Sequence, residues 1–334
     1  MYMKTLAIFV PIYNIKSEYI EKCISSLRTA RGYSTDFSVY IVDNASTNPE
    51  VNTTILKQIE NTDFTHIRLR KNKGKPSAVR AAYKKITEDY IVTLDGDDWI
   101  TGHKIVDLIS DLKIEKPDYV VTSYTYFNNK TGKSKKRNII PSKRRKDYYM
   151  LRKLPKYTWH FDPNTIISTK LLKENNFKLP ENITAYEDVY IAFFSLSNVK
   201  KPMYWTSSFY NYRINQNGTN LSAPSQITKR LKSFEEMYFE MMPFNFSNKV
   251  AKRNMTWHVF LSLFAITFFS LEANKKWFLT PVLFKYLNRV RKDNKKLYRR
   301  IMRSWLQLLM MLGIFLMDIL LISKLSSKIV SFTK

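Results

Sequence analysis

The chain of 334 residues has very few of the residues that build disulfides and zinc sites, with one cysteine and four histidines. Cys23 therefore has no intramolecular disulfide partner, and no cluster of cysteines and histidines has the spacing of a zinc site. These absences exclude a disulfide-stapled secreted scaffold and a zinc-finger protein. We expect a reducing, cytosol-facing location.

Acidic residues are also scarce, since 28 Asp and Glu stand against 55 Lys and Arg and leave a formal net charge of +27. Such an excess predicts attraction to polyanions, which include nucleic acid, an anionic membrane face and phosphorylated substrates. Hydrophobic residues make up 44% of the chain, which excludes global disorder. The length allows one catalytic domain of about 200 to 250 residues with an appendage.

Glycine-rich phosphate cradles are absent, because the chain has neither a G-x-G-x-x-G sequence nor a P-loop. The dinucleotide-binding and ATPase classes therefore lack their phosphate site. No internal repeat or coiled-coil heptad occurs. The first residues run directly into an apolar segment with neither the h-region nor the cleavage site of a signal peptide, so we expect no export signal.

Apolar segments with strand and helix character alternate through the first hundred residues. Strands are predicted at 5–10, 37–42, 67–69 and 90–94, and helices at 17–27, capped by Ser17, at 51–59 and at 78–86. This alternation predicts an α/β fold with a mostly parallel sheet and flanking helices, whose ligands bind at the carboxyl ends of the strands. Polar clusters at 11–14, 43–46 and 95–98 fall at such ends and are expected to converge.

Three carboxylates end the strand in the stretch DYIVTLDGDDW, residues 89–99. Asp95, Asp97 and Asp98 occupy four positions, and like charges so close repel one another unless a cation joins them. Mn²⁺ or Mg²⁺ is commonly held by one or two carboxylates, while phosphate oxygens of a bound nucleotide complete the shell. A solvated turn is the alternative, because Asp and Gly are also common turn formers.

The order FVPIYN, IVDNAST, RKNKGKPSAVRAAYKK and TLDGDDW resembles the nucleotide-sugar half of the family-2 glycosyltransferases of the bacterial cell-surface polysaccharide and teichoic-acid type. The resemblance extends over residues 5–222. It implies a Rossmann-like GT-A fold and inverting sugar transfer from a nucleotide sugar, expected to be UDP-linked. The implied catalytic domain is 1–222, with a nucleotide-sugar half at 1–100 and an acceptor half at 101–222.

The resemblance also implies roles for the donor-side residues. Pro11 and Tyr13 would pack on the uracil ring, and Asp43 and Asn44 would hydrogen-bond the base. Many members have a second aspartate at the position of Asn44, whose amide donates as well as accepts, so the choice of base stays open. Arg80 would reach the base, ribose or phosphates, as would Lys73 and Lys75, for which exposed surface positions are equally expected.

In the acidic stretch, the resemblance makes Asp97 the direct metal ligand. Asp95 would contact the ribose or a metal-bound water, and Asp98 would orient both. The metal would bridge the donor diphosphate and neutralise the leaving group.

A second set of candidates follows on the acceptor side. Glu187 and Asp188 resemble the family's Glu-Asp pair, which makes Asp188 the base that deprotonates the acceptor hydroxyl on the face opposite the leaving diphosphate. Acidic residues in the first turn of a helix also favour its macrodipole and need no other role. His160 is expected either to hydrogen-bond the acceptor or to pack.

The sequence Tyr210, Tyr212 and Arg213 resembles the aromatic-aromatic-Arg ending of the family's catalytic domain. Arg213 would clamp a phosphate, or form a structural ion pair. The Asn- and Gly-rich residues after it resemble a mobile loop that closes over the donor.

Two basic regions complete the pattern. Nine of the seventeen residues 130–146 are Lys or Arg, which predicts a surface loop or hairpin that is either a solvated insertion or a dock for an anionic acceptor or lipid head group. Farther on, residues 275–303 carry eleven Lys or Arg between apolar runs at 255–273 and 305–322. Both runs are close to the lower length limit for a membrane span, and Asp318 would be costly inside one.

We therefore expect 223–334 to be a helical region attached to an anionic membrane surface on its cytoplasmic face. One or two spans, or a helical domain that buries both apolar runs, are the alternatives. The expected activity is metal-dependent transfer to a cell-surface glycan or a polyprenyl-diphosphate-linked acceptor. A soluble or protein acceptor is the second hypothesis. A nucleic-acid-binding protein is the third, and no RNA- or DNA-binding signature supports it.

Overall fold

In a computed structural model of the chain, the described residues are 4–137, 148–150 and 165–214, with isolated helical positions between 233 and 303. The chain divides into two compact units, Met1–Met255 and Thr256–Lys334. The sheet lies in the first unit. The expected boundary between residues 222 and 223, and the apolar runs at 255–273 and 305–322, lie outside the described residues.

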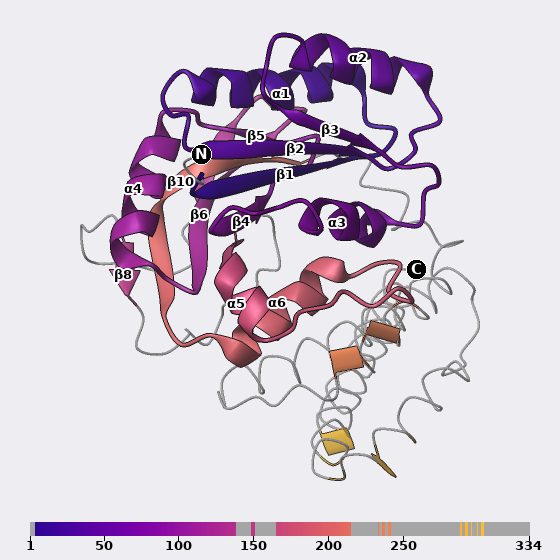
Figure 1. The fold of residues 1–334 in the computed structure, drawn as a ribbon, viewed down its shortest axis with the longest axis vertical. Helices are drawn as coiled ribbons and strands as arrows, with labels where there is room; N and C mark the ends of the chain where they lie inside the picture. Colours follow the sequence, from indigo (N-terminus) through magenta and orange to yellow (C-terminus); the bar gives the residue numbers. More distant parts are fainter. Residues whose placement is uncertain are drawn as a thin grey trace, which may run out of the picture. The chain divides into compact units, whose positions relative to one another are not determined.

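The first unit is built on one sheet of ten strands (Figure 1). Its main path has the order β3-β2-β1-β4-β9-β6-β10-β5, while β7 pairs with β6 and β8 with β10. The strands are β1 Leu6–Ile12, β2 Phe37–Asp43, β3 Thr65–Arg68, β4 Tyr90–Thr93, β5 Trp99–Ile100, β6 Tyr119–Asn128, β7 Ser134–Arg137, β8 Tyr148–Met150, β9 Thr165–Ser168 and β10 Pro202–Ile214.

Neighbouring strands β3, β2, β1 and β4 are parallel, and β6 is parallel to β10. Strand β9 joins these two parallel blocks, because it pairs antiparallel with both β4 and β6. The predicted α/β fold with flanking helices is confirmed. The sheet is mixed, because four of its strand pairings in the described residues are parallel and five are antiparallel.

Six helices flank this sheet in the described part of the chain. They are α1 Ser17–Arg31, α2 Pro49–Ile59, α3 Lys75–Tyr83, α4 Lys104–Glu115, α5 Thr169–Glu174 and α6 Glu187–Asn198. Figure 1 shows α1 and α2 over one face of β1, β2 and β3, with α3 on the other face. Apolar residues of α1, α2 and α4 form one buried cluster with residues of the strands, which holds these layers together.

Several element boundaries differ from the sequence prediction. Strand β1 continues through Pro11, since β4 pairs only with its first four residues and a proline N–H is not needed beyond them. The predicted cap at Ser17 is wrong: Lys16 holds the N-cap position, without a side-chain hydrogen bond. Helix α3 begins at Lys75, three residues earlier than predicted, with Pro76 in its first turn, where a proline is tolerated.

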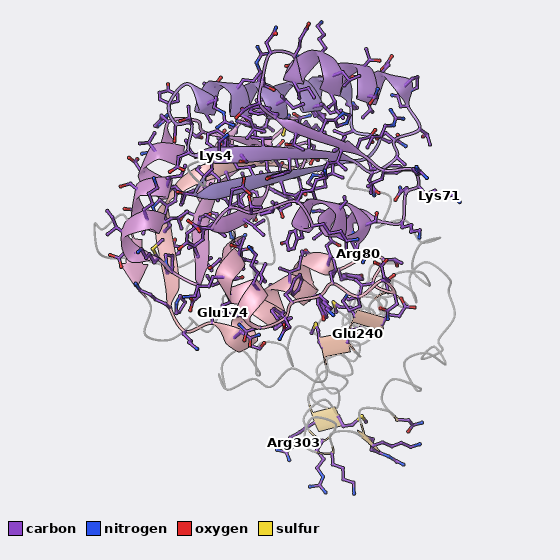
Figure 2. The ribbon with its side chains drawn as sticks, in the orientation of Figure 1. Lys4, Lys71, Arg80, Glu174, Glu240 and Arg303 are labelled. Atoms are coloured by element: carbon purple, nitrogen blue, oxygen red, sulfur yellow. The ribbon has the colours of Figure 1, made fainter. Side chains whose placement is uncertain are left out.

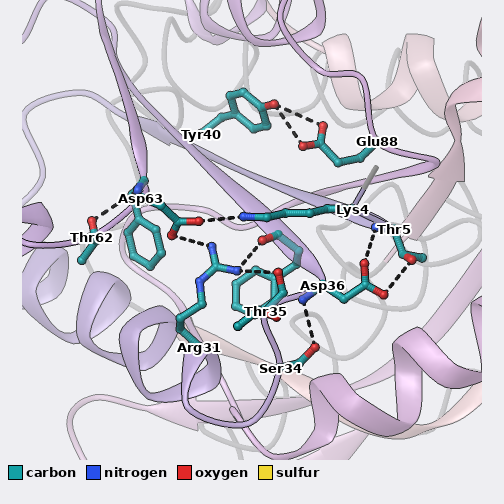
Figure 3. Close-up of polar contacts among 12 residues, drawn as sticks. Lys4, Thr5, Arg31, Ser34, Thr35, Asp36, Tyr40, Thr62, Asp63 and Glu88 are labelled. Carbon is teal, nitrogen blue, oxygen red and sulfur yellow. Dashed lines mark hydrogen bonds and ion pairs between the residues drawn. The ribbon is translucent and has the colours of Figure 1, made fainter. Parts of the chain in front are cut away.

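The amino ends of β1 and β2 are joined by a polar cluster (Figure 3). Asp36 accepts hydrogen bonds from the backbone N–H and the hydroxyl of Thr5, both at 2.9 Å. Asp63 accepts from Lys4 at 2.7 Å and from Arg31 at 2.9 Å. Burial alone would raise the pKa of Asp36, but hydrogen bonds from Lys113 and Thr5 outweigh it and lower the pKa. These ionic contacts brace the edge of the sheet opposite the polar clusters.

Candidate functional site

The polar segments after β1, β2 and β4 meet at one edge of the sheet. The backbone N–H of Asn14 donates to Ser46 Oγ at 3.0 Å, which joins the segments that follow β1 and β2. A Cβ on Gly96 would lie only 3.1 Å from the backbone oxygen of Pro11, so the segment after β4 packs on the end of β1. The predicted convergence of the three clusters is therefore confirmed.

The two residues at the end of β2 have different environments. Asn44 uses both ends of its amide around the start of α3. It accepts from Ser77 Oγ in the first turn of α3 at 2.9 Å, and it donates to Asn72 Oδ1 and the Gly74 oxygen before the helix, each at 3.0 Å. Asp43 is fully buried and accepts from Ser46 N at 2.8 Å through Oδ1.

The second carboxylate oxygen of Asp43, Oδ2, has no hydrogen-bond partner and lies 3.6 Å from Arg68 Nε. A buried oxygen without a donor can accept one from a ligand. A shallow hollow of about 480 Å³ next to Asp43 is lined by Ala45, Ser46, Arg68, Leu69 and Arg70. Pro11 is buried, whereas Tyr13 is 43% exposed. The predicted base contacts of Pro11, Tyr13, Asp43 and Asn44 stay predictions.

Asp98 holds the acidic turn against β10. Its Oδ1 accepts from the backbone N–H of Arg213 at 2.7 Å, and its Oδ2 accepts from the hydroxyl of Tyr210 at 2.5 Å. Burial, followed by the charges of Asp95 and Asp97, raises the pKa of Asp98 to about 8. Since protein donors occupy both oxygens, Asp98 holds the turn against β10, and its predicted part in orienting the metal site stays a prediction.

Arg213 binds the same turn from the other side. Its Nε donates to the backbone oxygen of Asp97 at 2.7 Å, and its Nη1 donates to Asn129 Oδ1 at 2.8 Å. The guanidinium also lies over the rings of Tyr19 and Trp99, at 4.2 and 4.9 Å from their centroids. The geometry gives Arg213 a structural role here, and its predicted contact with phosphate stays a prediction.

Glycines allow the close packing of this edge. A Cβ on Gly96 would lie 2.8 Å from Ile15 Cδ1, so the acidic turn rests directly on the segment after β1. Gly74 has φ of +84°, and a Cβ there would lie 2.1 Å from the backbone oxygen of Thr184. The segment before α3 therefore touches the segment before α6, and only glycine fits both requirements.

Lys75 links the donor-side turn to the acceptor-side pair. Its ammonium group lies 2.6 Å from Asp95 Oδ1 and 3.8 Å from Glu187 Oε1. Burial alone would lower the pKa of Lys75, but the carboxylates of Asp95, Glu187 and Asp188 outweigh it and raise the pKa above its ordinary value. Burial also raises the pKa of Glu187.

These residues surround a cavity of about 230 Å³. Its polar wall is formed by Lys75, Asp95, Glu187 and Asp188, and its apolar wall includes Val79 and Ile191. The Glu187–Asp188 pair opens α6 directly after Tyr186, whose backbone is left-handed at φ of +64°. The structure therefore brings the predicted base and the predicted donor-side aspartate to one cavity.

The acidic turn also fits a divalent cation completed by a substrate. Burial and the charge of Asp95 raise the pKa of Asp97, so a divalent cation bound there would favour its ionised form. Among the described residues, no three His, Cys, Asp or Glu side chains converge as a metal site. A site of one or two carboxylates therefore needs oxygens from a bound diphosphate, as is common for Mg²⁺.

The structure places Lys75 in the wall of the cavity and Arg80 outside it, and the predicted donor contacts of both stay predictions. Arg80 donates from Nη1 to the Pro180 oxygen at 2.8 Å and lies 3.5 Å from Glu181, and Figure 2 shows it between α3 and the segment before α6. Sequence reasoning ranked Arg80 above Lys75. The signal for Lys75 is its position between Gly74 and Pro76, which opens a helix at the carboxyl edge of the sheet. His160 and the predicted loop after Arg213 lie outside the described residues.

The sequence matches one protein family and several of its characterised members. The family model described as Glycosyl transferase family 2 matches residues 7–175. Poly(ribitol-phosphate) beta-N-acetylglucosaminyltransferase TarS of Staphylococcus aureus is 24% identical over 224 residues, which cover 66% of this chain and 37% of TarS. A poly(ribitol-phosphate) beta-glucosyltransferase of Bacillus spizizenii is 25% identical over 221 residues, 65% of this chain and 33% of the relative. The chain thus matches about a third of these relatives' length.

Solved structures agree on the architecture. S. aureus TarS 1–349 in complex with UDP-GlcNAc has a TM-score of 0.65 at 17% identity, covering 91% of this chain and 92% of that one. The mannosyltransferase PcManGT from Pyrobaculum calidifontis, in complex with GDP-Man and Mn²⁺, has a TM-score of 0.55 at 12% identity, covering 92% and 81%. The predicted GT-A fold is confirmed by this likeness.

Proposed function

The chain belongs to glycosyl transferase family 2, and on that premise we propose that it transfers a sugar, with inversion, from a UDP-linked donor to a poly(polyol-phosphate) glycan of the cell surface. The observation that carries the proposal is the shared cavity of Asp95 and Asp188. The matched relatives are named for transfer to poly(ribitol-phosphate), and a solved structure of similar fold holds UDP-GlcNAc.

On the donor side, the buried oxygen of Asp43 accepts a hydrogen bond from the base, and the exposed ring of Tyr13 packs on it. Asp97, beside Asp95, would hold Mn²⁺ or Mg²⁺. When bound, the cation neutralises charge on the departing diphosphate. Asp98, Tyr210 and Arg213 keep the turn in place, which leaves Asp97 oriented before the donor arrives.

On the acceptor side, Asp188 takes the proton of an acceptor hydroxyl as its oxygen attacks the anomeric carbon. The bond to UDP breaks on the opposite face, so the configuration inverts in one displacement. Lys75 holds Asp95 and Glu187 at a fixed separation. The donor site and the base Asp188 are thereby held at fixed positions relative to each other. This arrangement removes much of the entropic cost of bringing two substrates together.

We also propose that the protein associates with the cytoplasmic face of the membrane through 223–334. The basic stretch 275–303 supports attraction to anionic lipid. Within the part of the chain that the structure describes, no helix is long and apolar enough to cross a bilayer.

A transfer assay tests the proposed activity. The protein is incubated with a panel of UDP-sugars, a poly(ribitol-phosphate) acceptor and Mn²⁺, and sugar attached to the polymer is measured. We expect transfer from one or more donors and its loss with EDTA. If EDTA leaves turnover unchanged, the proposed metal dependence is wrong. If no UDP-sugar supports transfer although the protein still binds the donor, the proposed acceptor is wrong.

A further inference from the structure

The described part of the basic region 130–146 forms a hairpin, as predicted. Strand β7 pairs antiparallel with the end of β6, so that Lys135 lies opposite Tyr126 and Arg137 opposite Tyr124. Every residue from 129 to 137 is exposed, and none is acidic. Five of them are cationic: Lys130, Lys133, Lys135, Lys136 and Arg137.

Three of these cations lie on one face of the hairpin. Residues two apart on a strand point to the same side, about 7 Å from one another. Lys135 and Arg137 of β7 therefore share a face. The ladder continues one residue beyond β7, because the backbone oxygen of Lys133 accepts from Asn128 N at 2.9 Å, and this places Lys133 on the same face. Directly opposed residues on paired strands also share a face, which places Tyr126 beside Lys135.

An aromatic row connects this face to the cavity. Tyr212, which lines the cavity, is in register with Tyr126 on β6, and their ring centroids are 5.7 Å apart. Arg137 Nη1 donates to the hydroxyl of Tyr126 at 3.1 Å. A continuous row thus leads away from the cavity, from Tyr212 on β10 through Tyr126 on β6 to Arg137 on β7.

We propose that this surface, the basic ramp formed by Tyr212, Tyr126, Lys133, Lys135 and Arg137, binds the phosphodiester groups of the acceptor chain and leads a hydroxyl of the adjoining polyol to Asp188. The inference rests on the proposed function and assigns the acceptor side of the same site. The cavity wall is rich in carboxylates and repels phosphate, whereas the ramp attracts it.

A polymer of alternating phosphate and neutral polyol suits both surfaces, since its charges can stay on the ramp while an uncharged unit enters the cavity. An anionic bilayer is a poorer match. Apolar side chains that insert strengthen binding at a membrane interface, and residues 129–137 contain none.

A direct binding experiment tests the ramp. Fluorescently labelled poly(ribitol-phosphate) is titrated with the full chain and followed by anisotropy. The variant replaces Lys133, Lys135 and Arg137 by Gln, and the control replaces the exposed lysines Lys57, Lys170 and Lys173 by Gln, which removes the same charge. We expect about tenfold weaker binding and a shallower salt dependence for the ramp variant only, as for a few exposed ion pairs lost together.

Three results would overturn the ramp. One is equal affinity of the ramp variant and the control. Another is equally tight binding of a single-stranded DNA oligonucleotide with the same number of phosphates, which would show attraction to charge alone. The third is loss of sedimentation with phosphatidylglycerol vesicles in the ramp variant while polymer binding is unchanged.

Failure of the proposed function has a different signature. The wild-type chain would then bind the polymer through the ramp but transfer no sugar to it from any UDP-sugar. A shift in melting temperature on adding UDP and Mn²⁺ would show that each variant has kept its folded donor site.

Discussion

The ammonium group of Lys75 lies 2.6 Å from Asp95 Oδ1 and 3.8 Å from Glu187 Oε1, and the two contacts together tie the turn after β4 to α6, the helix that carries Asp188. The charges of Asp95, Glu187 and Asp188 raise the pKa of Lys75, so its ammonium form is favoured between them. Donor and acceptor sides of the cavity are thereby assembled by one cation from the protein itself.

Replacing Lys75 by Met is expected to lower kcat/KM for the UDP-sugar by about tenfold. A charge-assisted hydrogen bond contributes about 1.5 kcal/mol or more, and the lower value applies because this side chain is 38% exposed. Steady-state kinetics measure the loss, and Lys73→Met, at an exposed position two residues away, is the matched control. Equal losses of kcat/KM in both variants would mean that the lost positive charge, and not the contact of Lys75 with Asp95, causes the effect.

Asp188→Asn is expected to bind the donor normally but to transfer sugar about 10² to 10⁴ times more slowly, as when a general base is removed. Thermal shift with UDP and Mn²⁺ measures donor binding, and a transfer assay measures turnover. Asp107→Asn on α4 is the control. Wild-type turnover in Asp188→Asn would move the role of base to another residue.

Asp97→Ala is expected to abolish the stabilisation that UDP gives in the presence of Mn²⁺, since a ligand raises the melting temperature only if the folded state binds it. The unliganded melting temperature should change little, because a buried carboxylate with a raised pKa is not a source of stability. Asp107→Ala is again the reference. The assignment of the metal to Asp97 is lost if the UDP-dependent shift persists.

Acid is expected to unfold the protein partly through Asp36. Its folded pKa lies below the unfolded value of about 4, so its contribution is present above pH 4 and is lost as pH falls through the folded pKa. Asp36→Asn should lower the free energy of unfolding at pH 7 by about 1–3 kcal/mol and flatten its change between pH 5 and 3. Urea unfolding across this range tests both, and an unchanged slope would contradict the linkage.

Residues 1–255 alone are expected not to sediment with anionic liposomes, whereas the full chain should. The cut follows the boundary of the first compact unit, which keeps the buried residues Ser233, Met237 and Met241. Neutral liposomes provide the control. Continued sedimentation of residues 1–255 with anionic vesicles would place the membrane contact in the catalytic unit.

The sequence was sufficient to predict the buried strands and the edge at which their polar ends meet. Each of those strands is a local apolar run, and parallel pairing brings their carboxyl ends together. The antiparallel insertion of β9 between β4 and β6 could not be predicted, since its partners are distant in the chain. The choice of Lys75 over Arg80 depends on which face of α3 packs inward, and tertiary packing decides that.

Strand β9 also governs the order in which the molecule can assemble. As the chain leaves the ribosome, β1, β2, β3 and β4 are available long before Ser168 emerges, so the edge of β4 that β9 will cover has no partner during that interval. Open strand edges invite pairing between nascent chains. A premature stop between β6 and β9 would therefore leave unmatched the edge of β4 and the edges of β6 that pair with β9 and β10, and its product is a target for chaperones and proteases.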